Sequence, residues 1–186
     1  MNRPVLMGGL QPLRSRSILL WIVWVWLPVA VCLTAVAWES TDTFSSAHTS
    51  GWLRHLAERI FGVIAQPTWD RAHHAVRKTG HFVGYGLMGL AWLRAWLLMS
   101  VLYLRRLTPA AWRGYAIAMA LSSTMLSATV DEIHQTYIPS RTGLASDALL
   151  DTSGAATLIL LISLSWLCKN TSLASRKDSM HTTRSA

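Results

Sequence analysis

The stretch ILLWIVWVWLPVAVCLTAVA, residues 18–37, carries no charged side chain over its whole length. At about 1.5 Å per residue, a helix of this length crosses a hydrocarbon core of roughly 30 Å. The rest of the chain has the same character, because 52% of its 186 residues are hydrophobic and only 14% are charged. This balance is typical of a small polytopic membrane protein. We therefore expect one all-α transmembrane domain over residues 18–167.

Three further apolar stretches follow the first. They cover residues 82–104, interrupted by Arg94, residues 114–130, and residues 148–167, with Asp151 in the first turn. The sequence thus predicts four transmembrane helices. The first stretch, ending in Ala35-Val36-Ala37, also resembles a cleavable signal peptide, but it is longer than the usual signal core. Cleavage there would leave three spans.

The distribution of charge predicts the topology. Basic residues precede the first span, separate the second from the third and follow the fourth, whereas every acid except Asp178 lies in or beside the other connections. By the positive-inside rule, both termini are cytoplasmic and the protein is a multi-pass protein of the plasma (inner) membrane. Residues 1–17 and 168–186 are then cytoplasmic tails, the second disordered. The basic residues neither cluster on one face nor alternate with aromatics, which argues against nucleic acid as a partner.

The connection between the first two spans contains an amphipathic pattern. Apolar residues from Trp52 to Ile64 fall on one half of a helix that Ser50 can cap, while Arg54, His55 and Glu58 fall on the other half. Such a helix lies in the membrane interface, or packs on the bundle for stability. In the second span, Gly80, Gly84, Gly86 and Gly89 would let another helix approach closely.

Polar residues form three stripes at one end of the predicted bundle. Lys78, His81 and Tyr85 are spaced by three and four residues, so they share one helix face. The other two stripes are Asp131 with Gln135, and Asp147 with Asp151. All three fall in the outer leaflet of the predicted topology, where charge is costly unless it is paired or hydrated. We therefore expect them to converge in one outward-facing cluster.

The cluster suits an anionic ligand. Arg141 offers a planar fork for phosphate or carboxylate, and acids crowded beside an apolar boundary cannot all ionise cheaply. We expect a membrane lipid or lipid-linked cell-wall precursor as the ligand; no partner protein is indicated. The predicted roles are proton handling by His81, Asp131, Glu132 and Asp151, and ligand contact by Lys78, Tyr85, Gln135, Arg141 and Asp147. His48, His55, His73, His74 and His134 are interpreted as interfacial or solvated.

Two alternatives use the same residues. In the first, His81, Asp131 and Asp151 bind a divalent metal and Glu132 acts as a base; because the spacing matches no known ligand motif, we assign neither metal nor cofactor. In the second, the cluster is a lock between helices, with an acid paired to Arg141 and Gln135 bonded across helices. The protein is then a non-catalytic membrane interaction protein.

The polar residues also resemble a known family. The pattern is Lys78-x-x-His81-x-x-x-Tyr85, then Asp131-Glu132-x-His134-Gln135-x-x-Ile138-Pro139-x-Arg141, then Asp147-x-x-x-Asp151-x-x-Gly154. It resembles the VanZ-like membrane proteins, and the resemblance implies a four-helix protein of the cell envelope linked to resistance to the glycopeptide teicoplanin. The resemblance brings no reaction with it. Members of that family usually carry Asn at the position of Asp151, so this chain has one more carboxylate there.

Overall fold

The structure is a computed structural model that describes residues 16–103 and 107–182. Within these ranges it consists of helices and contains no strand, which confirms the predicted all-α class. The elements in order are α1 (Arg16–Glu39), the short 3-10 helix η2 (Asp42–Phe44), α2 (Ser46–Phe61), α3 (Gln66–Tyr103), α4 (Pro109–Thr136) and α5 (Ala145–Thr182).

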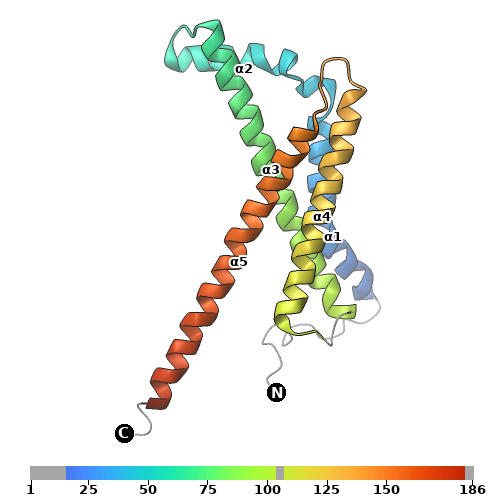
Figure 1. Cartoon of the computed structure of the whole chain (residues 1–186). Coiled ribbons are helices and arrows are strands. Elements are labelled where there is room, and N and C mark those ends of the chain that lie inside the picture. The colour runs from blue at the N-terminus through green and yellow to red at the C-terminus, as the bar shows by residue number, and fades with distance from the viewer. Residues whose placement is uncertain (1–15, 104–106, 183–186) are drawn as a thin grey trace.

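The four long helices α1, α3, α4 and α5 run in alternating directions, with α3 and α5 inclined to the other two, and α3 contacts all three of the others (Figure 1). Small side chains on α3 allow this packing: Ala91 and Ala95 are buried against Val25 and Val29 of α1. Helix α5 crosses α3 and diverges from the bundle toward its own C-terminal end (Figure 1). The shared end of the bundle, where α2 lies, is formed by the end of α1, the start of α3 and the loop between α4 and α5 (Figure 1).

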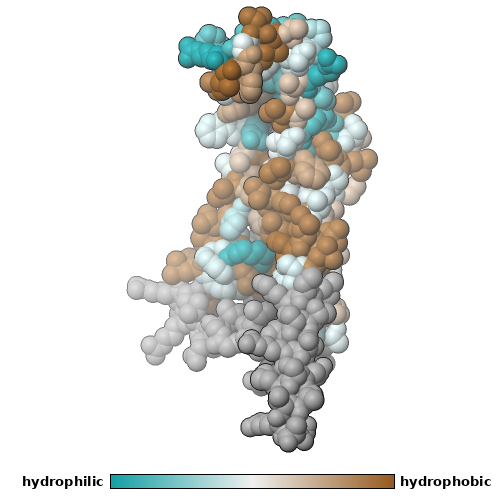
Figure 2. Space-filling model, turned by 90° about the vertical axis from the view of Figure 1, so that its left-hand side faces the viewer, coloured by the Kyte–Doolittle hydropathy of each residue, from teal (hydrophilic) through white to brown (hydrophobic). Residues whose placement is uncertain are grey.

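In the described part of the chain, three helices are long and apolar enough to cross a membrane: Ile18–Glu39, Gln66–Ser100 and Ala145–Trp166. Hydrophobic residues accordingly cover much of the middle of the molecule, whereas most of the hydrophilic residues gather at the end that carries α2, where they are mixed with hydrophobic ones (Figure 2). The stretch expected as a further span, residues 114–130, falls inside α4 but is not among these three. Its Ser and Thr residues lower the mean hydropathy of this helix.

The crossing of α3 and α5 depends on glycine. A Cβ on Gly154 would lie 2.1 Å from the backbone oxygen of Phe82, and one on Gly89 would lie 2.5 Å from Cβ of Ala155. The predicted close approach of another helix is therefore confirmed at Gly86 and Gly89. It is wrong at Gly80 and Gly84, where an added Cβ would meet nothing within 4 Å.

Helix α2 lies across the end of the bundle, at a steep angle to α1 and α4 (Figure 1). Several of its apolar side chains are exposed, among them Trp52, Leu56, Ile60 and Phe61. The helix begins at Ser46, before Ser50, so the predicted cap at Ser50 is wrong. Ser50 instead accepts a hydrogen bond of 2.7 Å from Nε1 of Trp69, which ties α2 to the first turn of α3.

The C-terminal segment differs from the sequence prediction. Helix α5 continues to Thr182, whereas the sequence analysis expects disorder from residue 168. Extending an existing helix fixes only one residue per new hydrogen bond, and Leu173, Ala174, Arg176 and Lys177 are good helix formers. Residues 1–15 of the expected N-terminal tail and residues 183–186 lie outside the described residues.

Candidate functional site: a polar cavity between α3, α5 and the α4–α5 loop

The three polar stripes meet. Lys78 forms an ion pair with Asp147, and one turn farther along α3 Nδ1 of His81 lies 3.5 Å from Oδ2 of Asp151. One more turn along, the Tyr85 hydroxyl donates a hydrogen bond of 3.1 Å to Asp131. Lys78 and His81, on two successive turns of α3, thus contact α5, and Tyr85 on the next turn contacts α4. The predicted convergence of the stripes is confirmed.

Asp131 is the most fully bonded member of the cluster. Its carboxylate accepts hydrogen bonds from Ser40, from Tyr85 and, at 2.9 Å, from Nε2 of Gln135. All four side chains are buried. These bonds join the segment after α1 to α3 and α4, and they leave Asp131 little capacity for a ligand. Its position is that of a connector between helices.

Glu132 points away from the other acids. Its Oε2 accepts a hydrogen bond of 2.7 Å from the backbone N–H of Leu144, just before α5 begins. The residue lines a separate, mainly apolar cavity of about 350 Å³ between α4 and α5. Glu132 therefore holds the start of α5 and does not face His81.

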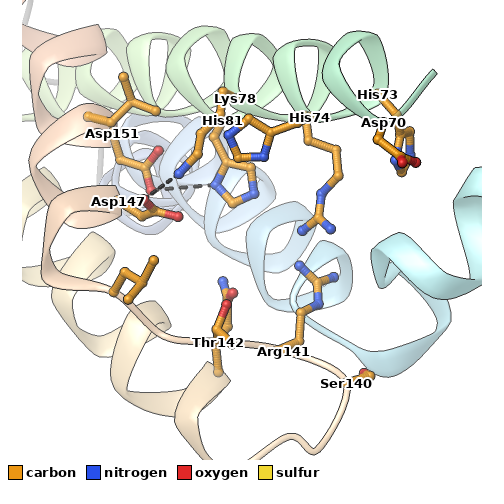
Figure 3. Close-up of a pocket in the computed structure, with 14 residues that line it drawn as sticks. Asp70, His73, His74, Lys78, His81, Ser140, Arg141, Thr142, Asp147 and Asp151 are labelled. Atoms are coloured by element: carbon orange, nitrogen blue, oxygen red, sulfur yellow. Dashed lines mark hydrogen bonds and ion pairs between the residues drawn. The ribbon is translucent and has the colours of Figure 1, made fainter. Parts of the chain in front are cut away.

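The remaining polar residues line a cavity of about 370 Å³, which we call the polar cavity (Figure 3). One wall comes from the first turns of α3, a second from α5, and a third from the end of α4 and the loop after it. Six of the nine predicted site residues line it, and Tyr85, Asp131 and Glu132 do not; the lining comprises Asp70, His73, His74, Arg77, Lys78, His81, Gln135, Ser140, Arg141, Thr142, Leu144, Asp147, Leu150 and Asp151.

Asp151 lies at the closed end of the polar cavity. Its side chain is 0% exposed, and neither carboxylate oxygen has a hydrogen-bond partner among the described residues. Among the described residues, Asp151 forms an ion pair with His81 alone. The ring of His81 stacks on that of Tyr85, with ring centroids 6.2 Å apart. A buried carboxylate is costly without a partner. The pair could hold one proton between them and pass it to or from a bound group.

Arg141 forms the opposite side of the polar cavity. Its Nη2 donates hydrogen bonds to the backbone oxygens of Glu39 and, at 3.1 Å, Thr41, so the residue is anchored to the end of α1. Only 9% of it is exposed, and its Nε has no partner among the described residues. Burial lowers the pKa of the Arg141 guanidinium and the charge of Arg77 lowers it further, while more distant carboxylates oppose both. An arginine remains a cation even so.

Sequence reasoning missed part of the lining. His74, Arg77 and His81 follow the three- and four-residue spacing of a helix face, and this spacing could have extended the Lys78 stripe backward. His73 was interpreted as interfacial or solvated, which is wrong. It is 7% exposed and stacks on Trp69 with ring centroids 5.5 Å apart. Ser140 and Thr142 carry no periodic signal because they lie in a loop.

The metal alternative does not assemble. Within the described residues, no group of three or more His, Cys, Asp or Glu side chains is placed to hold a metal ion. Asp131 bonds to Ser40, Tyr85 and Gln135, and Glu132 faces the other cavity. His81 and Asp151 remain as a pair without a third ligand of that kind.

Comparison with known proteins places the chain in one family. No curated protein and no solved structure gives a significant match. The model of the VanZ/LLP1 family, however, matches residues 17–167, from the start of α1 to the last described side chains of α5. This range includes every residue of the polar cavity. The protein therefore belongs to the VanZ/LLP1 family.

Proposed function

We propose that the protein binds the anionic headgroup of an envelope lipid, or of a lipid-linked cell-wall precursor, in the polar cavity. The observation that carries this proposal is a buried acid, Asp151, that has no hydrogen-bond partner among the described residues and lies beside His81, in the same cavity as the nine-tenths buried Arg141. Polar groups of this kind are costly in a membrane protein and usually mark a functional site. Leu144 and Leu150 add apolar surface to the cavity wall, which suits a ligand with a lipid portion.

The position of the cavity supports a lipid as the ligand. Arg141 bonds to the backbone of Glu39, the last residue of the first candidate span. The candidate span in α3 has 35 residues, or roughly 52 Å of helix, which exceeds a hydrocarbon core of about 30 Å. The first turns of α3, including Lys78, therefore extend beyond the core. The cavity then lies at the depth of the headgroups.

In this proposal α4 is the fourth span. It has 28 residues, or roughly 42 Å of helix, and it packs against both α3 and α5. Four crossings return α5 to the side on which α1 begins, as the alternating directions in Figure 1 allow. Basic residues concentrate in the sequence on that side, which makes it cytoplasmic and directs the polar cavity outward.

Helix α2 completes the proposed arrangement as an interfacial helix. Ile60 and Phe61, at the end of this helix, are 69% and 78% exposed. Lipid at the membrane surface would cover them. Arg54 binds Glu58 and the backbone oxygen of Ile64 on the polar side of the same helix.

The cavity would also allow a proton transfer to or from the bound headgroup. His81 and Asp151 would supply or accept the proton at the bound group, as general acid–base pairs do. An effect on glycopeptide susceptibility follows if the ligand is a cell-wall precursor; this link depends on the family resemblance.

The test compares two histidines. Full-length protein, its His81→Ala variant and its His134→Ala variant are reconstituted in phosphatidylcholine nanodiscs doped with phosphatidylglycerol, and retained lipid is measured by native mass spectrometry. His134 is exposed and does not line the cavity, so it serves as the control. We expect preferential retention of phosphatidylglycerol by the wild type and the control, and its loss in His81→Ala. If the wild type retains phosphatidylglycerol, and phosphatidate supplied in its place, only in bulk proportion, the proposal is overturned.

A second function is favoured by Asp131. Its three hydrogen bonds make the inner part of the cluster a lock between helices, which fits a non-catalytic interaction protein. If the lock is the whole function, His81→Ala lowers the thermal midpoint without changing lipid retention.

A further inference from the structure

Two arginines of the polar cavity have no carboxylate partner among the residues that the structure describes. Arg77 from α3 and Arg141 from the loop after α4 both line the cavity. Among the described side chains, the ion pairs involve Lys78 with Asp147, His81 with Asp151, Arg54 with Glu58 and His48 with Asp42. Neither Arg77 nor Arg141 takes part in one. The positive charge of this part of the cavity is therefore not neutralised within the described part of the protein.

Two of the three acids that line the cavity are already paired. Asp147 is bound to Lys78, and Asp151 faces His81. Asp70 accepts a hydrogen bond of 2.9 Å from the neutral Gln66, and Figure 3 places it beside His73, on the other side of the cavity from Asp151. Among the described side chains, no ion pair joins Asp70 to either arginine. The guanidinium of Arg141 points into the space between these groups (Figure 3). Arg77 and Arg141 thus remain two cations of the cavity without a carboxylate ion pair among the described side chains, an arrangement that suits a bound anion.

The two guanidinium groups indicate the charge of an anion that would suit this part of the cavity. A phosphate monoester carries about −1.5 to −2 charges near pH 7, whereas a phosphodiester carries one. Two guanidinium groups match the first more closely. Arg77 can bind phosphate oxygens through two parallel N–H groups, whereas Arg141 has already committed its Nη2 to the backbone oxygens of Glu39 and Thr41 and contributes its charge and its other N–H groups. Ser140, Thr142 and His74 line the same space and add neutral donors.

From this arrangement we infer that Arg77 and Arg141 together bind a terminal phosphate group, either a phosphomonoester or the outer phosphate of a diphosphate. This inference rests on the proposed headgroup function and narrows it, because a phosphodiester headgroup would leave one guanidinium unmatched. It also assigns a binding role to Arg77, which the sequence patterns did not indicate. The phosphate could belong to a lipid or to a free molecule.

The test uses full-length protein in phosphatidylcholine nanodiscs with four probes. Phosphatidate supplies a lipid phosphomonoester and phosphatidylglycerol a lipid phosphodiester, while inorganic phosphate and pyrophosphate supply free anions. Lipid retention is read by native mass spectrometry, and all four probes are also read by the shift in thermal midpoint. The variants are Arg77→Gln and Arg77→Lys. Arg71→Gln is the control, because Arg71 is exposed on the same helix and does not line the cavity.

We expect the wild type to prefer phosphatidate to phosphatidylglycerol, and Arg77→Gln to weaken phosphatidate binding by roughly tenfold or more. Arg77→Lys should recover part of the affinity, since it restores the charge but not the fork. Arg71→Gln should match the wild type. A midpoint shift with pyrophosphate equal to that with phosphatidate would support the same phosphate site and identify a free anion as a sufficient ligand.

Two results would overturn the inference in distinguishable ways. If phosphatidylglycerol binds in a His81-dependent manner but phosphatidate is not preferred and Arg77→Gln has no effect, the terminal-phosphate inference fails while the headgroup proposal stands. If none of the four probes binds, both fail.

Discussion

Arg94 donates a hydrogen bond of 3.1 Å to the backbone oxygen of Trp24, the acceptor that Pro28 leaves without its helical partner. In an α-helix the N–H of residue 28 would bind the oxygen of residue 24, and proline has no N–H. Arg94 also donates to the oxygen of Val25 at 3.0 Å, and its Cζ lies 3.9 Å from the centroid of the Trp24 ring. Arg94, a cation within the candidate span of α3, is thereby stabilised by a backbone oxygen of α1 that lacks its helical hydrogen bond.

This relationship predicts a coupled effect on stability. Arg94→Leu should lower the free energy of unfolding by about 1–3 kcal/mol, because the Trp24 oxygen is left unsatisfied in an apolar environment. In a Pro28→Ala background the same change should cost less, since alanine at this position supplies the missing N–H. A double-mutant cycle on thermal or denaturant unfolding in nanodiscs measures the difference. Equal costs in both backgrounds would show that Arg94 does not serve the Trp24 oxygen.

The α3–α5 crossing predicts opposite effects for two glycines of similar helical setting. Gly154→Ala should destabilise the protein by about 1–3 kcal/mol, because its Cβ would overlap the backbone of Phe82, which cannot move as a side chain does. Gly84→Ala meets nothing within 4 Å. It should be neutral or stabilise the helix by about 0.5–1 kcal/mol. Thermal midpoints of the two variants decide the matter, and equal midpoints would contradict the crossing geometry.

The connector role of Asp131 predicts a specific cost for removing one hydroxyl. Tyr85→Phe deletes one of its three donors and should cost about 1.5–3 kcal/mol, as a buried hydrogen bond to a carboxylate does. Tyr115→Phe is the matched control, because Tyr115 is 40% exposed and its hydroxyl has no hydrogen-bond partner among the described residues. Both variants are compared by thermal unfolding. Lipid retention should stay unchanged in both, since neither tyrosine lines the polar cavity.

The spacing of polar residues in the sequence was sufficient to predict that the polar stripes converge. Residues three and four apart share a helix face, so Lys78, His81 and Tyr85 had to point one way, and alternating spans had to bring them to one end of the bundle. The spacing could not show which acid each would meet. It therefore could not separate Asp131, which is saturated with hydrogen bonds, from Asp151, which is not.

Other features depended on groups that carry no periodic signal. Arg94 has no partner in the sequence pattern, because its acceptors are backbone oxygens exposed by Pro28. Glu132 follows Asp131 directly, so it was grouped with the cluster, yet adjacent residues on a helix point about 100° apart. Its partner is a backbone N–H of the next loop. Backbone groups and loop side chains such as Ser140 and Thr142 become visible as partners only in three dimensions.

Glu132 predicts different costs for two substitutions. Its Oε2 accepts a hydrogen bond of 2.7 Å from the backbone N–H of Leu144, just before α5 begins. Glu132→Gln keeps an oxygen that can accept this bond, so the variant should unfold close to the wild type. Glu132→Ala leaves the N–H of Leu144 unsatisfied and should lower the free energy of unfolding by about 1–3 kcal/mol relative to Glu132→Gln. Thermal or denaturant unfolding in nanodiscs measures both variants. Equal free energies of unfolding would show that Glu132 does not hold the start of α5.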